Sequence, residues 1–163
     1  TATPTPTPTA APGGLTGDSA AVLQAVLDAA DARLGEDDKL PGSFVTTVDG
    51  TTASAMLGVA AEQFGSYATD ASVATAAIGT FPHAVAIIKC KDAAAAGEVK
   101  KLVAGGFDPE KWICVFPEQC FVVESGEYIL LAATKNVSAD ALIAGFTELS
   151  GGSVGSVNVF YAR

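Results

Sequence analysis

Apolar side chains recur along the chain with two spacings, one typical of helices and one of strands. The first predicted helix begins at Asp18 or Ser19, ends at Gly35 and carries its apolar face on Val22, Leu23, Val26, Leu27, Ala30 and Leu34. Similar spacing and capping residues predict further helices over 52–64, 93–104 and 139–149, and a helical turn over 110–114. Short apolar runs predict strands over 44–48, 73–78, 84–90, 120–123 and 128–134, and a strand or docked tail over 157–161.

The order of these elements indicates the fold class. From residue 73 to residue 149 the predicted order is ββαββα, and two helices precede it. Strands in hairpin pairs, separated by helices, are typical of an antiparallel sheet. Ser125-Gly126 predicts a tight hairpin turn between the last two strands of this unit. We therefore expect an α+β fold in which an antiparallel sheet carries helices packed on one face.

The first 17 residues differ in composition from the rest of the chain. Residues 1–12 read TATPTPTPTAAP, without a charge or a large apolar side chain, and Gly13 and Gly14 follow. Proline restricts φ and removes a backbone donor, which favours an extended, polyproline-like chain. We expect residues 1–17 to be a disordered or extended spacer and residues 18–163 to be a single domain. The first residue is Thr rather than Met, so we expect a processed chain whose upstream part is a signal peptide ending in a lipid-modified cysteine.

Composition and charge exclude several classes of protein. The 163 residues include 18 acidic and 9 basic side chains, for a net charge of −9, and so strong an acidity disfavours binding to phosphate backbones. A hydrophobic content of 49% with 17% charged residues is typical of a folded domain. No apolar run approaches the ~18 residues that a membrane-spanning helix needs. The acidic cluster Glu36, Asp37 and Asp38 is interpreted as a solvated loop.

Candidate catalytic residues are few. The chain has one histidine, His83, which follows Pro82 and is interpreted as a turn residue at the edge of a strand. One histidine disfavours a Cys/His zinc site and a serine triad. The acidic pairs Glu124 with Glu127 and Asp108 with Glu110 are explained by solvent exposure and capping. Because glycine-rich phosphate-binding motifs are absent as well, we expect no cofactor and no metal, and no catalytic residue is assigned.

Two other groups of side chains leave alternatives open. Cys90, Cys114 and Cys120 are either free thiols or, in an oxidising compartment, include a disulfide between Cys114 and Cys120 across the bend at Pro117. Trp112 and Tyr128 are candidates for an aromatic binding surface that takes a sugar or a peptide. The alternative is that Trp112 covers one end of the core.

A family resemblance is carried by the strand at 84–90 with the helix start at Asp92, by the Trp- and Pro-containing link, by the strand at 127–134 and by the closing helix that ends at 146–149. Over residues 18–149 the chain resembles a domain-of-unknown-function family found in predicted bacterial lipoproteins, often of gut anaerobes. The resemblance implies an exported, tethered domain. It implies no activity and no site residues, and this chain has Ala84 where we would expect an acidic residue in the family.

These observations favour a surface-tethered extracytoplasmic domain with a binding or envelope-structural role. Its expected partner is a protein, a peptide or a glycan, and it contacts the membrane only through an N-terminal lipid anchor. The first alternative is an extracytoplasmic hydrolase whose acidic residues come together only in the fold. The second is a subunit of a larger envelope assembly that uses the strand at 157–161 as its contact.

Overall fold

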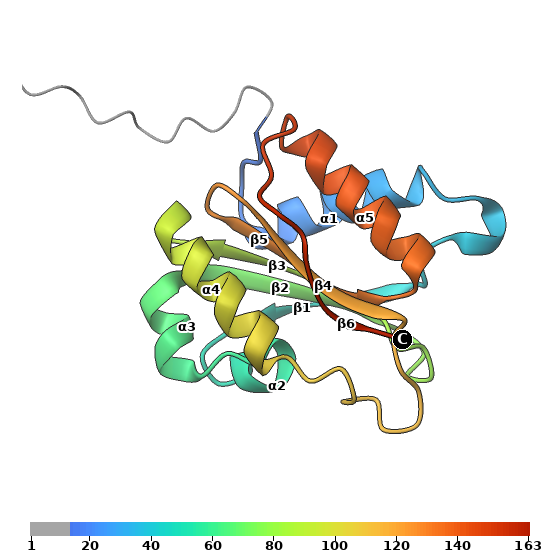
Figure 1. The fold of residues 1–163 in the computed structure, drawn as a ribbon, viewed down its shortest axis with the longest axis horizontal. Helices are drawn as coiled ribbons and strands as arrows, with labels where there is room; N and C mark the ends of the chain where they lie inside the picture. Colours follow the sequence, from blue (N-terminus) through green and yellow to red (C-terminus); the bar gives the residue numbers. More distant parts are fainter. Residues whose placement is uncertain (1–13) are drawn as a thin grey trace, which may run out of the picture.

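The computed structural model describes residues 14–163, in which one antiparallel sheet lies between two groups of helices (Figure 1). The sheet has six strands in the order β1-β2-β3-β5-β4-β6, and each neighbouring pair is antiparallel. The strands are β1 (Ser43–Val48), β2 (Ala68–Ala76), β3 (Ala84–Cys90), β4 (Gln119–Ser125), β5 (Tyr128–Thr134) and β6 (Asn158–Ala162). The helices are α1 (Ser19–Asp31), α2 (Ala53–Leu57), α3 (Ala61–Tyr67), α4 (Ala93–Gly106) and α5 (Asn136–Leu149), with a short 3-10 helix η1 (Glu36–Asp38).

This architecture confirms the α+β class and the antiparallel sheet. From β2 to α5 the elements follow the predicted order ββαββα. Strands β3 and β5 match their predicted bounds, and β6 is a strand that pairs with β4 rather than a docked tail. The hairpin between β4 and β5 has a two-residue loop at 126–127, one residue later than predicted, with Gly126 at φ 56°.

The helices cover both faces of the sheet, which differs from the expected packing on one face. Helices α1 and α5 pack on the face that carries Ile87 and Leu130. Helices α2, α3 and α4 pack on the face that carries Ile88 and Ile129. The reason lies in the central strands, whose successive residues point to opposite faces and are apolar on both. Each face therefore requires its own cover.

Helix α1 is fixed to the sheet through its first turn. Asp18 caps the helix as predicted, because its Oδ1 accepts a hydrogen bond from the backbone N–H of Ala21 at 2.8 Å. Asp70 of β2 accepts a further bond from the backbone N–H of Ser19 at 2.9 Å. The hydroxyls of Ser19 and Ser72 lie 2.8 Å apart in the core. These bonds pair polar groups that burial would otherwise leave unsatisfied.

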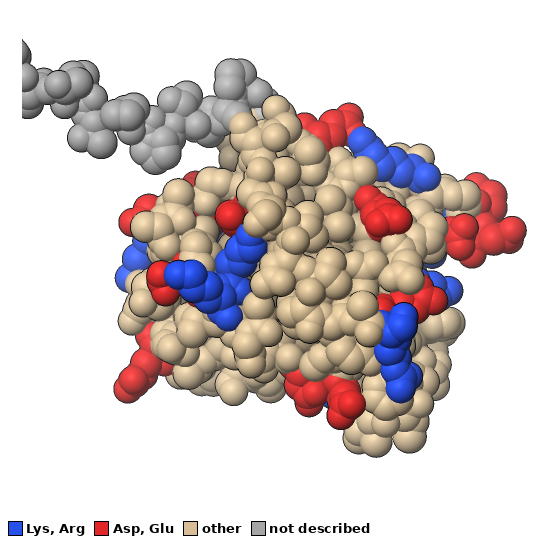
Figure 2. Space-filling model, in the orientation of Figure 1, with Lys and Arg blue, Asp and Glu red and all other residues tan. Residues whose placement is uncertain are grey.

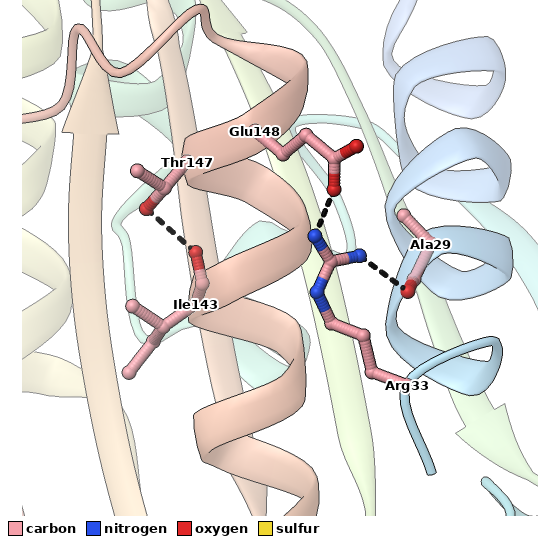
Figure 3. Close-up of polar contacts among 5 residues, drawn as sticks. All are labelled: Ala29, Arg33, Ile143, Thr147 and Glu148. Atoms are coloured by element: carbon pink, nitrogen blue, oxygen red, sulfur yellow. Dashed lines mark hydrogen bonds and ion pairs between the residues drawn. The ribbon is translucent and has the colours of Figure 1, made fainter.

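Helices α1 and α5 lie against one another along their C-terminal halves (Figure 3). Arg33, which follows α1, donates to the carbonyl of Ala29 at 2.9 Å and forms an ion pair with Glu148 of α5. The helices approach closely because α5 has Gly145 at the contact, where an added Cβ would lie 3.1 Å from the Cβ of Ala29. Close packing of small residues, supported by an ion pair that is partly exposed to solvent, joins these two helices.

Two other predicted elements are divided or absent. The predicted helix over 52–64 is two helices, because Gly58 adopts φ 73° and ends α2. The helical turn predicted over 110–114 is replaced by turns, and Ile113 has φ 67° there. Strand β2 also begins at Ala68, earlier than the predicted residue 73.

The chain meets the fold at Leu15, which is half-buried against the core under α1 and α5, and is hydrogen-bonded to it at Gly17. The carbonyl of Gly17 accepts hydrogen bonds from Tyr128 Oη at 2.6 Å and from Lys89 Nζ at 3.2 Å. The predicted spacer over 1–17 lies mostly outside the described residues, and Gly17 itself is held by the folded domain.

Among residues 14–163, none of the helices combines the length and apolar character that crossing a bilayer requires.

The C-terminal end of α4 touches the C-terminal end of α2 through two glycines. A Cβ added to Gly106 would lie 2.0 Å from the carbonyl oxygen of Gly58, and a Cβ on Gly58 would lie 2.1 Å from the carbonyl carbon of Gly106. The neighbouring Gly105 has nothing within 4 Å of such a Cβ. The backbones of the two helices are therefore in direct contact at Gly106, whereas Gly105 faces open space.

We expect Gly106→Ala to lower the free energy of unfolding by about 2–3 kcal/mol, because a methyl group would overlap rigid backbone. Gly105→Ala is the matched control and should raise the free energy of unfolding by about 0.5–1 kcal/mol, since alanine reduces the entropy of the unfolded chain. Urea unfolding of both variants and the parent measures the two effects. Equal stabilities for the two variants would contradict the backbone contact.

Candidate functional site

A cleft of about 480 Å³ opens at the end of the sheet where β2 leads into β3 and where β5 leads into α5. Its volume falls within the roughly 300–1,000 Å³ range of small-molecule sites in proteins. Four segments that are separate in the sequence line it: Asp37, Asp38, Lys39, Pro41 and Gly42; Ala77, Ile78, Phe81, Pro82 and His83; Phe116, Pro117 and Glu118; and Thr134, Lys135 and Ser138.

Two Phe-Pro dipeptides form apolar walls of the cleft. Phe81-Pro82 comes shortly before β3, and Phe116-Pro117 comes shortly before β4. Because β3 and β4 both pair antiparallel with β5, they begin at the same end of the sheet, on the two sides of Thr134. Proline has a fixed φ and no N–H to donate to a ladder, so both dipeptides stay outside the sheet. The topology thus places two similar segments on either side of one opening.

The floor of the cleft is buried, whereas much of its rim is exposed. His83, Thr134 and Ser138 are 4%, 1% and 4% exposed, and Pro117 is buried as well. The rim carries the apolar side chains Ile78 and Phe81, which are 60% and 44% exposed, together with exposed charged residues of the η1 loop and the start of α5. A ligand would therefore pass an apolar and charged rim to reach a neutral polar floor.

His83 is held in place by both its backbone and its ring. Its N–H donates to the carbonyl of Phe81 at 2.9 Å, and its carbonyl accepts from the N–H of Ala76 at 3.2 Å. Its Nδ1 lies 2.8 Å from Thr134 Oγ1, so the ring is fixed against the end of β5. The structure thus places His83 directly before β3, close to the expected strand edge, but as a buried part of a cleft.

The other ring nitrogen of His83 is unpaired. Nε2 is buried and has no hydrogen-bond partner among residues 14–163. Burial lowers the pKa of His83 from 6.5 to about 4, because the charged imidazolium would lose its hydration. At pH 7 the buried imidazole is therefore neutral and has one nitrogen without a partner among the described residues. Leaving such a group unpaired costs free energy.

The start of α5 is organised by Glu118. Its Oε2 accepts a hydrogen bond from the backbone N–H of Asn136 at 2.6 Å, and its own N–H donates to the carbonyl of Thr134 at 3.0 Å. The helix predicted over 139–149 begins three residues earlier, at Asn136. Ser138 therefore lies buried in its first turn and lines the cleft, and does not cap the helix. A carboxylate at the helix start is favourable because it meets the positive end of the helix dipole.

The charges around the cleft are of both signs. Lys39 is bonded to Asp31, through the carbonyl at 2.8 Å and the carboxylate at 3.8 Å. Acidic side chains gather on the η1 loop, and on the face in Figure 2 acidic and basic groups are interspersed over a mostly uncharged surface. The net charge of −9 is therefore not gathered into one acidic patch on this face.

The structure does not bring Trp112 and Tyr128 together as one binding surface. Tyr128 is 3% exposed, belongs to the core between the sheet and helices α1 and α5, and donates its hydroxyl to Gly17. Trp112 is half-buried and packs against the core on the opposite face of the sheet. Lys111 Nζ lies 5.6 Å from the centre of the Trp112 ring. Neither aromatic residue lines the cleft.

All three cysteines are free thiols in the structure. Cys90 and Cys120 are fully buried in β3 and β4, and burial raises the pKa of each thiol to about 12. Cys114 is exposed in the link that precedes β4. The candidate disulfide would therefore join an exposed thiol to one that points into the core, whereas the alternative of free thiols matches the structure.

The acidic pairs singled out in the sequence lie outside the cleft. Glu124 forms an ion pair with Lys100 of α4, and Asp108 accepts a hydrogen bond from the N–H of Glu110 at 2.9 Å. Asp37, Asp38 and Glu118 are the acidic residues that do line the cleft. Within the described residues no group of three or more His, Cys, Asp or Glu side chains is placed to hold a metal ion.

Sequence reasoning identified His83 and the bend at Pro117 but not the cleft that they share. A usable signal was present, because the dipeptide Phe-Pro occurs twice, each time followed by one polar residue and a strand. Two such strands that both pair antiparallel with a common neighbour must begin at the same end of the sheet.

Comparison of the chain with protein-family models, with curated proteins and with solved structures finds no match. The lipoprotein-family resemblance therefore stays a prediction.

Thiol reactivity distinguishes the two predicted states of the cysteines. Because Cys114 is exposed while the other two thiols are buried with a raised pKa, one thiol should react rapidly with a thiol reagent in the native protein. All three should react after unfolding in guanidinium without a reductant. A total of one thiol under those conditions would instead show that two of the three cysteines form a disulfide, and peptide mapping would then test the pair Cys114 and Cys120.

The burial of His83 predicts a specific pH dependence of stability. Its pKa is about 4 in the folded protein and near 6.5 in the unfolded chain, so the unfolded chain takes up the proton first as the pH falls. The contribution of the neutral His83 to the free energy of unfolding is complete above pH 6.5. It decreases as the pH falls towards 4, by about 3 kcal/mol in total. Urea unfolding between pH 4 and 7.5 should show a steeper loss for the parent than for His83→Gln, which does not titrate. Parallel curves would contradict a buried neutral His83.

Proposed function

We propose that this protein is a surface-tethered extracytoplasmic module that binds a small molecule in the cleft at the His83 end of the sheet. The observation that carries the proposal is a cleft of about 480 Å³ that is lined by the buried His83, whose Nε2 has no partner among the described residues. Apolar walls with a few fixed polar groups are the usual composition of a ligand site. A bound molecule would cover the exposed Ile78 and Phe81 and would pair the buried ring nitrogen.

The position of the cleft relative to the start of the fold supports tethered display. The chain is hydrogen-bonded to the domain at Gly17, beside Lys89 and Tyr128, which lie at one end of β3 and β5. The cleft lies at the other end of these strands, beside His83 and Thr134. Seven residues of strand at ~3.3 Å each separate the two ends by about 20 Å. A domain anchored through its N-terminal segment would thus present the cleft away from the anchor.

The location outside the cytoplasm rests on the sequence. The Thr/Pro-rich residues 1–12 have the composition of a spacer, and the family that the chain resembles consists of predicted lipoproteins. A spacer before a folded domain keeps a binding site clear of the surface to which the protein is attached. The acidic composition also keeps the domain soluble near that surface.

A screen of small fragments by two-dimensional NMR of the labelled domain tests the binding function. We expect the amide signals that shift to belong mainly to residues lining the cleft, because binding there changes their surroundings. Phe81→Ala should weaken binding about tenfold, since it removes one wall. Phe44→Ala is the control, because Phe44 is 67% exposed on β1 and does not line the cleft.

Three results would contradict the proposal. Shifts confined to residues outside the cleft would place the binding site elsewhere, and equal losses in Phe81→Ala and Phe44→Ala would show that the cleft wall has no specific part. The location has its own readout in intact cells that produce the full-length protein. Externally added protease should degrade the domain, and complete protection while a known surface protein is degraded would overturn surface display.

A further inference from the structure

We infer that the cleft selects an uncharged ligand, in which an apolar body carries a hydroxyl or amide group that hydrogen-bonds to His83 Nε2. This inference rests on the proposed function and names the chemistry of the ligand. Three observations carry it: the uncharged residues of the floor, the unpaired ring nitrogen of His83, and the pairing of charged rim residues with other groups of the protein.

The floor offers nothing that would compensate a buried charge. Its buried members are an imidazole, two hydroxyls and a proline ring, from His83, Thr134, Ser138 and Pro117. Burial holds the pKa of His83 at about 4, so the ring carries no charge at neutral pH. Moving an ionised group of a ligand onto such a floor costs several kcal/mol unless a partner of opposite charge is present.

The ring nitrogen favours a ligand group that can both donate and accept. Nδ1 of His83 pairs with the hydroxyl of Thr134, which can serve as donor or as acceptor. Nε2 is consequently either an acceptor or a donor, depending on which nitrogen carries the proton. A hydroxyl or an amide matches both tautomers, whereas an ammonium group can only donate and a carboxylate can only accept.

The rim lacks a strong charge of one sign to attract an ion. Lys39 is bonded to Asp31, and Glu118 is bonded to the start of α5. Lys135 is exposed, and the acidic Asp37 and Asp38 line the same cleft from the η1 loop. Opposite charges at the mouth largely cancel and are screened by salt, so selection falls to the floor and the apolar walls.

Three probes with one ring system and different head groups test the inference: 2-naphthylmethanol, 2-naphthoate and 2-naphthylmethylamine in its ammonium form. We expect the alcohol to bind at least tenfold more tightly than either ion at pH 7, because only the alcohol leaves no charge on the floor. Binding is measured by NMR titration. His83 is the sole histidine, so labelling histidine with ¹⁵N gives one imidazole whose Nε2 shift should move with the alcohol.

The variant His83→Phe keeps an apolar ring at the floor and removes the nitrogen. It should reduce the preference for the alcohol over the two ions, while the Phe44→Ala control leaves the preference unchanged. Thermal unfolding of His83→Phe establishes that the variant is folded. If it is not folded, the ¹⁵N shift of the parent decides whether Nε2 is the contact.

The outcomes separate this inference from the binding function on which it rests. Tighter binding of 2-naphthoate or of the ammonium probe within the cleft would overturn the choice of an uncharged ligand and leave the binding function intact. Binding of the alcohol without any change at Nε2 would overturn the contact with His83. Failure of all three probes would also overturn the inferred class, and the fragment screen decides separately whether the cleft binds small molecules.

Discussion

The pairing of β3 with β5 at the centre of the sheet sets the requirements that the other elements meet. Ile87 lies opposite Leu130, and Ile88 lies opposite Ile129, so the two faces of this pair are equally apolar. Every residue of β5 is buried. A strand pair of this kind is stable in water only when both faces are covered, because apolar surface left exposed costs about 25 cal/mol per Å². The two helix layers and the flanking strands follow from that demand.

The need to bury both faces of the β3–β5 pair also explains which parts of the fold were predictable from the sequence. The strands at 84–90 and 128–134 were identified because long apolar runs are strong local signals, and Asp18 and Asp92 marked helix starts that the structure confirms. The covering of both faces was not predicted, because hairpin-paired strands are typical of sheets with one solvated face, whereas the unbroken apolar runs of β3 and β5 require cover on both. The break at Gly58 was not predicted either, because apolar residues on both sides of it keep helical spacing in the sequence; in the structure Gly58 ends α2 at φ 73°.

The candidate site was less predictable than the fold because four distant segments build it. His83 read alone is an ordinary residue beside a proline, and its burial depends on Thr134, which is 51 residues away. Trp112 and Tyr128 attracted attention as aromatic residues, yet the sheet separates them because they pack on opposite faces. Residue type alone did not show that these two aromatic residues lie apart, whereas the strand order places Phe81 and Phe116 at one opening.

The helix layer formed by α1 and α5 joins the two ends of the domain, and this affects how the chain folds. Helix α1 contacts β2 and β3, while α5 contacts β4 and β5, so each helix covers only part of their common face. During synthesis the first helix emerges long before the last, and their contact has a high sequence separation. The face is complete only after residue 149 is available. A chain truncated before α5 would expose apolar sheet surface, and such species associate rather than remain monomeric.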